Sequence, residues 1–245
     1  MKGDNIKKIF YLIIVLGGTL TLNVNAEEYF YKNKNGILLN ENEYKFFKDF
    51  YTENYIDYIT EDIYNDFLNN GFFDKKVFST EYNGSNLLTR GAVHETNSKL
   101  IRMSKVCSSH CKISIVAKWK KSPVVRSYDL IGIYLEGGNF ENISYAKLFS
   151  DGTCVENTET KKTDNALSTT IKLPTKGNSL EIIQSFDVKK SGIIYSSYQH
   201  AKKSISLANS RKFSFSKYGY GNVYLFDESV RSYYDAMQGV SINLN

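Results

Sequence analysis

The feature that most constrains the fold is a period-two alternation of side chains that begins near residue 99. In residues 111–119, one set of alternate positions is Cys, Ile, Ile, Ala and Trp, and the other is Lys, Ser, Val and Lys. Successive side chains of a strand point to opposite faces, so this pattern predicts a half-buried strand whose inward set ends at Trp119. Further segments rich in strand-forming residues follow at spacings of roughly 8 to 15 residues. They are 128–135, 168–173, 180–188, 192–198, 205–207, 212–216, 223–226 and 240–244.

Turn-forming residues rather than helices separate these segments. Many short strands in this arrangement predict a mainly β fold, an antiparallel β-sandwich or a partly closed barrel over residues 99–245. One exception is expected at residues 227–238, where an acidic start and apolar positions spaced three and four apart favour a short surface helix.

The segment 27–72 has a different period and is predicted to be a small α-helical hairpin. Asn40 and Glu43 match a capping box, in which each side chain bonds to the other residue's backbone amide. Aromatic residues then recur at spacings of three and four: Tyr44, Phe47, Phe50 and Tyr51. Such a stripe could form a ligand groove, but we expect it to be a packing face. A second helix is expected from residue 60, and residues 73–98, without a sustained period, are expected to form a linker or irregular crossover.

The first 26 residues have the order of a secretory signal peptide. Lys2, Lys7 and Lys8 precede the apolar run 9–16, and residues 24–26 supply small side chains for cleavage after Ala26. The apolar run is about half the roughly 20 residues needed to span a bilayer, so no stable membrane anchor is expected after cleavage. The mature protein is therefore expected to be secreted, either extracellular or associated with the cell wall.

Composition and motifs exclude several function classes. Only five of the 31 basic residues are Arg, which argues against a nucleic-acid partner. Cleavage would remove three Lys and one Asp, so the net charge would fall from +5 to +3. The motifs of serine hydrolases, zinc proteases, calcium loops and phosphate loops are missing from the sequence, so no metal and no cofactor is expected.

Three cysteines leave several pairings open. Cys107 and Cys111 flank a three-residue connection between two strand-like segments, and a hairpin would place them opposite each other, so a disulfide between them is the leading prediction. A bond from Cys154 to either of them is an alternative. A metal site built from these cysteines with His110, and His94 or Cys154, is a further alternative, although its spacing matches no common zinc pattern.

The most basic stretch supplies the candidate binding residues. These are Lys118, Lys120, Lys121 and Arg126, together with Tyr218 and Tyr220 of a second predicted loop. Lysines there could attract anionic partners such as cell-wall phosphates, sulfated glycans or lipid headgroups. The simpler interpretation is a solvated loop between two strands, with Trp119 turned into the core.

Four parts of the chain together resemble a known group: residues 119–133, 198–201, 221–223 and 234–240. Their pattern resembles a family of uncharacterised exported proteins from AT-rich Gram-positive gut bacteria (Firmicutes). These proteins share a signal peptide, a short acidic and aromatic helical segment and a β-rich body. The resemblance covers most of the mature chain and implies export, but it brings no activity with it.

The sequence thus favours an extracellular or cell-surface binding module whose partner is a cell-wall or host glycan or a protein. One alternative is a secreted hydrolase without a recognisable motif, for which His200 would be the base. Another is a membrane-active toxin, suggested by the alternation in residues 168–173, although any half-exposed strand shows such alternation.

Overall fold

The computed structural model describes residues 29–78, 93–143, 146–155, 158–162, 164–204, 214–215, 223–224, 234–236 and 239–245. The expected signal peptide, the segment 205–207 and both Tyr218 and Tyr220 lie outside these residues. Within them, no helix has the length and apolar character needed to cross a membrane.

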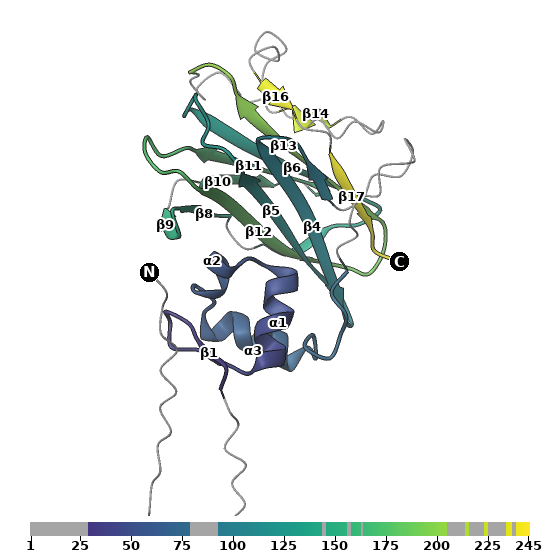
Figure 1. The fold of residues 1–245 in the computed structure, drawn as a ribbon. Helices are drawn as coiled ribbons and strands as arrows, with labels where there is room; N and C mark the ends of the chain where they lie inside the picture. The colour runs from purple at the N-terminus through teal and green to yellow at the C-terminus, as the bar shows by residue number, and fades with distance from the viewer. Residues whose placement is uncertain are drawn as a thin grey trace, which may run out of the picture.

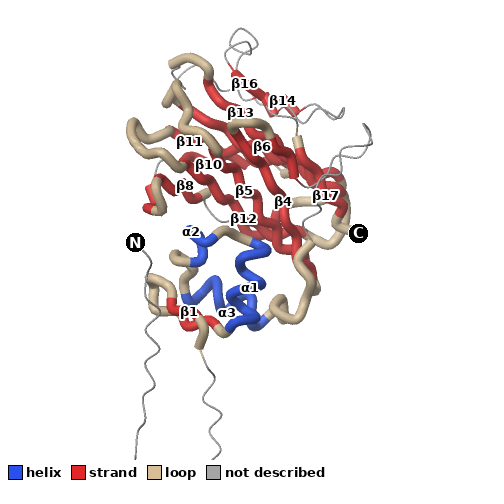
Figure 2. The backbone as a smooth tube through the Cα atoms, in the orientation of Figure 1, coloured by secondary structure: helices blue, strands red, loops and turns tan. Residues whose placement is uncertain are grey.

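Two antiparallel sheets are stacked face to face, and short helices pack against the outer face of one of them (Figures 1 and 2). We call the sheet beneath the helices the helix-side sheet and the other the far sheet. The helix-side sheet has the order β3 (Val93–Glu95), β4 (Lys99–Cys107), β5 (Cys111–Trp119), β12 (Leu180–Val188), β8 (Lys147–Ser150) and β9 (Thr153–Val155), with β7 (Phe140–Ile143) also paired to β12.

The far sheet completes the sandwich. Its order is β10 (Thr158–Lys162), β11 (Ala166–Lys172), β6 (Tyr128–Glu136), β13 (Ile193–Ala201) and β16 (Tyr234–Ala236), with β17 (Val240–Asn243) also paired to β13. Two small ribbons, β1 (Tyr31–Lys32) with β2 (Leu38–Leu39) and β14 (Ser214–Phe215) with β15 (Val223–Tyr224), lie outside both sheets. The mainly β prediction is confirmed, and of its two forms the sandwich is correct, because the two sheets do not close into a barrel.

The main core lies between the sheets and contains the inward set predicted for β5. Cys111, Ile113, Ile115 and Ala117 are fully buried, and Trp119 is 6% exposed. The prediction that Trp119 belongs to the core is confirmed.

The opposite face of β5 is also buried, so the prediction of a half-buried strand is wrong. Lys112, Ser114 and Val116 are covered, and only Lys118 is exposed. The reason is a second apolar core on this face, in which Val106, Val116 and Ile183 of the sheet meet the aromatic side chains of the helices.

The helical region contains α1 (Glu41–Phe50), α2 (Glu53–Ile56) and α3 (Glu61–Asn69), where the sequence predicted two helices. The capping box is confirmed: Asn40 accepts a bond from the Glu43 amide at 2.9 Å, and Glu43 accepts one from the Asn40 amide at 3.0 Å. The aromatic stripe is a packing face, because Phe47 and Phe50 are fully buried and Tyr51 is 2% exposed. Helix α2 has only four residues, too few for a helical period to appear in the sequence.

Lys112 fixes the helical region to the sheet. Its ammonium group lies 2.7 Å from Asp66 of α3 and 2.6 Å from Asp187 of β12. It also lies over the ring of Phe67, 5.4 Å from its centroid.

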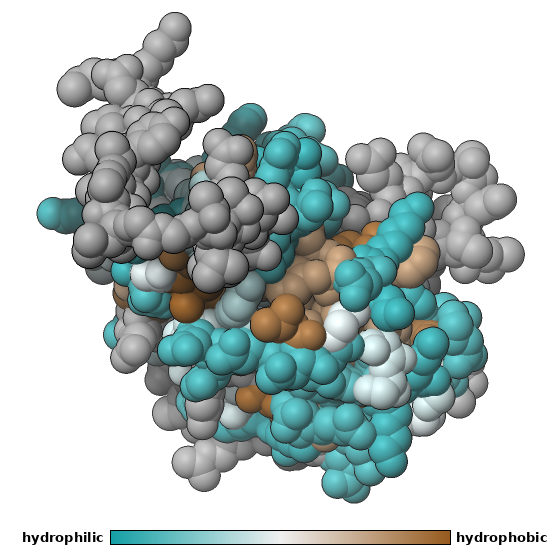
Figure 3. Space-filling view, turned by 90° about the horizontal axis from the view of Figure 1, so that it is seen from below, coloured by the Kyte–Doolittle hydropathy of each residue, from teal (hydrophilic) through white to brown (hydrophobic). Residues whose placement is uncertain are grey.

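Figure 3 views this end of the molecule from below and shows an apolar area among hydrophilic side chains. The large exposed apolar side chains of the helical region include Tyr29, Phe30, Leu38 and Leu68.

Two further segments refine the sequence analysis. Residues 234–236, inside the helix predicted over 227–238, form strand β16, because their backbone pairs with residues 199–201 of β13. Long-range pairing therefore overrides a helical spacing at these positions. Within residues 73–98, Phe73 packs against the helical core, Phe78 bridges to Lys105, and β3 extends the helix-side sheet.

Candidate functional site

Three of the predicted binding lysines gather where β5 ends. Lys118 points away from the main core with its side chain 49% exposed, and its ammonium group lies 3.8 Å from the carboxylate of Glu181. Lys120 pairs with Glu95, and Lys121 is exposed. The sheet thus presents several amino groups at one end, where the chain leaves β5 for β6.

The loop that follows is tied to a neighbouring loop by Arg126. Its guanidinium donates to the carbonyl oxygen of Pro174 at 3.1 Å and also bonds to the carbonyl of Gly177 and the hydroxyl of Ser122. Arg126 therefore joins residues 120–127 to residues 173–179, and we call these two loops together the loop tip. Its donors are directed at groups within the two loops, whereas the side chains of Lys118, Lys120 and Lys121 are exposed.

The loop tip is further braced and carries one apolar point. The carboxylate of Asp151 accepts bonds from the amides of Asn178 at 2.9 Å and Ser179 at 2.8 Å, which fixes the second loop. Pro123 is buried, and the next residue, Val124, is 99% exposed. Lys176 adds another exposed amino group. The tip thus combines two braced loops with exposed amino groups and one fully exposed apolar residue.

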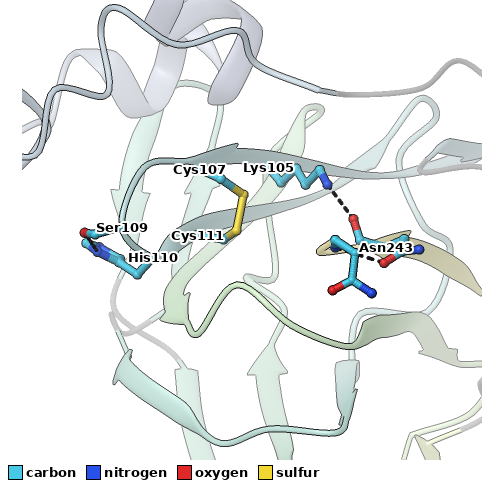
Figure 4. The surroundings of a disulfide bond; sticks show 7 residues. Lys105, Cys107, Ser109, His110, Cys111 and Asn243 are labelled. Carbon is cyan, nitrogen blue, oxygen red and sulfur yellow. Dashed lines mark hydrogen bonds between the residues drawn. A yellow bond between two sulfur atoms is a disulfide. The ribbon is translucent and has the colours of Figure 1, made fainter.

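The disulfide lies at the opposite end of β5. Cys107 and Cys111 are bonded to each other across the β4–β5 turn, with Cα atoms 4.1 Å apart (Figure 4). The leading prediction is confirmed. The two alternatives, a disulfide from Cys154 to Cys107 or Cys111 and a metal site built from these cysteines, are wrong because the two sulfurs are bonded to each other. Among the described residues, no group of three or more His, Cys, Asp or Glu side chains is arranged to hold a metal ion.

A buried polar cluster joins the two sheets at the end of β5 that carries the lysines. Its centre is Asp129 of β6, which is 0% exposed. The carboxylate accepts a bond from the indole Nε1 of Trp119 at 2.9 Å, lies 2.7 Å from Nδ1 of His200, and accepts the hydroxyl of Tyr198. Burial raises the pKa of the Tyr198 phenol well above its usual value, and the charge of Asp129 adds to this effect.

Lys99 and Asp235 form the second part of the cluster. Lys99 is 1% exposed, and its ammonium group lies 2.7 Å from Oδ2 of Asp235. The ring centroids of Trp119 and Tyr198 are 5.4 and 5.7 Å from the same nitrogen. The six side chains of this cluster come from strands of both sheets, so it can hold the sheets in register.

The sequence analysis missed most of this cluster. Lys99 is a charged residue at an inward position of an apolar strand, and so is Asp129. A charged residue at an inward position could have predicted the cluster, because a charge on a buried face needs a partner. His200, the base considered for a hydrolase, is 6% exposed, and its ring packs edge-on against Trp119 with centroids 4.6 Å apart.

The segment considered for a membrane-active toxin is also internal. Residues 168–172 belong to β11, which lies between β10 and β6, and Thr169 and Ile171 are fully buried. Their alternation therefore reflects the two faces of a strand inside the far sheet.

No protein-family model matches the chain, and no curated protein matches it significantly. Solved structures with a similar arrangement come from streptococcal surface proteins. A structure described in connection with Streptococcus parasanguinis adhesion by Fap1 fimbriae is 15% identical, with a TM-score of 0.35, and the match covers 69% of this chain and 94% of that one. The RrgB pilus backbone of Streptococcus pneumoniae is 9% identical, with a TM-score of 0.33, and the match covers 55% of this chain and 40% of that one.

A third similar structure is the N-terminal domain of the Streptococcus gordonii adhesin Sgo0707. It is 8% identical, with a TM-score of 0.34, and the match covers 62% of this chain and 34% of that one. This chain therefore spans less than half of the RrgB and Sgo0707 chains that it matches.

Proposed function

We propose that the protein is an exported binding module whose loop tip contacts an anionic glycan polymer at a cell surface. The observation that carries this proposal is that Lys118, Lys120 and Lys121 are exposed where β5 runs into the loop that bears the fully exposed Val124. Exposed lysines attract negatively charged polymers through long-range forces that salt weakens.

The bracing of the tip supports a binding role. Binding to a mobile loop costs conformational entropy, whereas a loop held in place before contact avoids much of that cost. Arg126 and Asp151 hold the two loops through backbone carbonyls and amides, and so the lysines project from a fixed base. The sandwich beneath, with its packed core, supplies the rigid support that a binding loop needs.

The ion pairs that these lysines make within the protein are weak enough for a charged ligand to replace. Lys120 is paired with Glu95, and Lys118 is only loosely paired with Glu181 at 3.8 Å. Exposed pairs of this kind are weak, so a polyanion with many charges can displace them. Val124 can pack against the apolar side of a sugar ring while the lysines contact its acidic groups.

The ligand class is tested with two polymers of the same backbone. We expect the protein without residues 1–26 to bind immobilised dextran sulfate with an affinity that falls as salt is raised, and to show no binding to uncharged dextran. Equal binding to both polymers would contradict the anionic-ligand proposal, and so would an affinity for dextran sulfate that salt leaves unchanged.

A further inference from the structure

We propose that Lys99 and Asp235 condense into an intramolecular amide that links the two sheets covalently. The site is the second part of the buried polar cluster, where the Lys99 nitrogen lies 2.7 Å from the Asp235 carboxylate and 3.4 Å from the Asp235 carbonyl oxygen. The two groups that would form the bond are thus already in contact in the folded chain.

The register of the strands explains why these groups meet. Lys99 pairs with Trp119 across β4 and β5, and both side chains point between the sheets. Asp129, His200 and Asp235 pair in a row across β6, β13 and β16 of the far sheet, so they share one face. His200 contacts Trp119, which identifies that face as the inner one. The fold therefore brings an amine from one sheet against a carboxylate from the other.

The surroundings of Lys99 favour the neutral product over the ion pair. Burying a charged ammonium group is costly, and the amide that replaces it carries no charge. Lys99 is almost fully enclosed between two aromatic rings, and Asp235 is its one ion-pair partner among the described residues. Groups held in contact react as if present at very high concentration, which favours a slow condensation.

Lys112 provides a useful contrast within the same protein. It is also largely buried, but two carboxylates, those of Asp66 and Asp187, share its ammonium group. With two negative partners, the charged form of Lys112 is better compensated than that of Lys99. We therefore assign the amide to Lys99 alone.

The reaction balances without any other reactant. The nitrogen of Lys99 bonds to the side-chain carbonyl carbon of Asp235, and one carbon–oxygen bond of the carboxylate breaks. Two of the three ammonium protons leave with that oxygen as water, and the third stays on the amide nitrogen. The Asp235 side chain is 47% exposed, so the water has a way out.

Intact-mass spectrometry of the folded chain tests the proposal directly. We expect a mass lower, by one further water molecule, than that calculated for the sequence with its disulfide. After reduction and trypsin digestion, residues 91–102 should remain joined to residues 232–245, because the modified Lys99 is no longer cleaved. An intact mass that equals the calculated one, with Lys99 cleaved normally, would overturn the proposal.

Matched variants identify the bonded residue. Lys99→Arg should abolish the mass loss, because a guanidinium does not condense with a carboxylate under these conditions. Lys105→Arg makes the same change on the same strand, where the lysine bonds to the carbonyl of Asn243, and should retain the loss. A loss that persists in Lys99→Arg would show that another pair reacts and would overturn the assignment.

Discussion

The indole N–H of Trp119 donates a hydrogen bond of 2.9 Å to the carboxylate of Asp129 and thereby joins the helix-side sheet to the far sheet. Tyr198 and His200 bond to the same carboxylate from the adjacent strand. One buried charge on β6 thus satisfies polar groups on two other strands, β5 and β13. The lone Trp of the chain is therefore both an apolar core residue and a polar contact between the sheets.

This arrangement makes Asp129 a sensitive position. Asp129→Ala would leave the polar groups of Trp119, Tyr198 and His200 without their shared acceptor inside the core. We expect the free energy of unfolding to fall by about 3 to 5 kcal/mol, as measured by urea denaturation. Asp164→Ala, at an exposed position, should change it by no more than about 0.5 kcal/mol. Similar small effects for both variants would contradict the central role of Asp129.

The buried tyrosines predict a loss of stability in base. Burial raises the pKa of the phenols of Tyr198 and Tyr51 well above 10.0, so the folded state favours their protonated forms. Their contribution is complete below the unfolded pKa of about 10 and is lost as the pH rises above it. Urea unfolding at a series of pH values should show this fall, and Tyr198→Phe should make it less steep. A Tyr198→Phe variant with the unaltered slope would contradict the prediction.

We expect Lys112 to stabilise the packing of the helical region against the helix-side sheet. Lys112→Met keeps most of the side chain but leaves the buried carboxylate of Asp187 without its cation. We expect a loss of about 3 to 5 kcal/mol in unfolding free energy. Lys172→Met, at an exposed position of β11, serves as the control and should be nearly neutral. If both variants unfold at the same urea concentration as the unmodified protein, the anchoring role is wrong.

We expect the disulfide between Cys107 and Cys111 to add little to the stability of the fold. Its two cysteines are only four positions apart, so it restricts little of the unfolded chain. The loop-entropy relation gives a stabilisation of about 2 kcal/mol or less. Replacing both Cys107 and Cys111 by Ser should therefore lower the melting temperature by a few degrees and leave the circular dichroism spectrum intact. Loss of the folded spectrum at room temperature would contradict this expectation.

Local patterns in the sequence predicted the features that depend on neighbouring residues. The alternation in 111–119 identified β5 and the orientation of Trp119, the Asn40 and Glu43 pair identified the start of α1, and the cysteine spacing identified the hairpin disulfide. In each case the interacting residues are close in sequence, and so the spacing carries the information.

Features that depend on distant contacts were missed. Burial of Lys112 requires α3 and β12, which are far from it along the chain. The meeting of Lys99 with Asp235 spans 136 positions, and β16 itself was predicted as helix. No spacing rule connects residues so far apart, because their contact depends on how the two sheets stack.

The most direct test of the binding account compares two charge reversals at opposite ends of β12. Lys120→Glu with Lys121→Glu alters the loop tip, and Lys189→Glu with Lys190→Glu makes the same charge change at exposed positions beyond the other end of β12. The Kd for soluble dextran sulfate is measured for both folded variants in the same buffer. We expect the tip variant to bind at least about tenfold more weakly, a difference of about 1.4 kcal/mol, and the control to stay close to the unmodified protein. Equal weakening in the two variants would show that only total charge matters and would contradict a binding site at the loop tip.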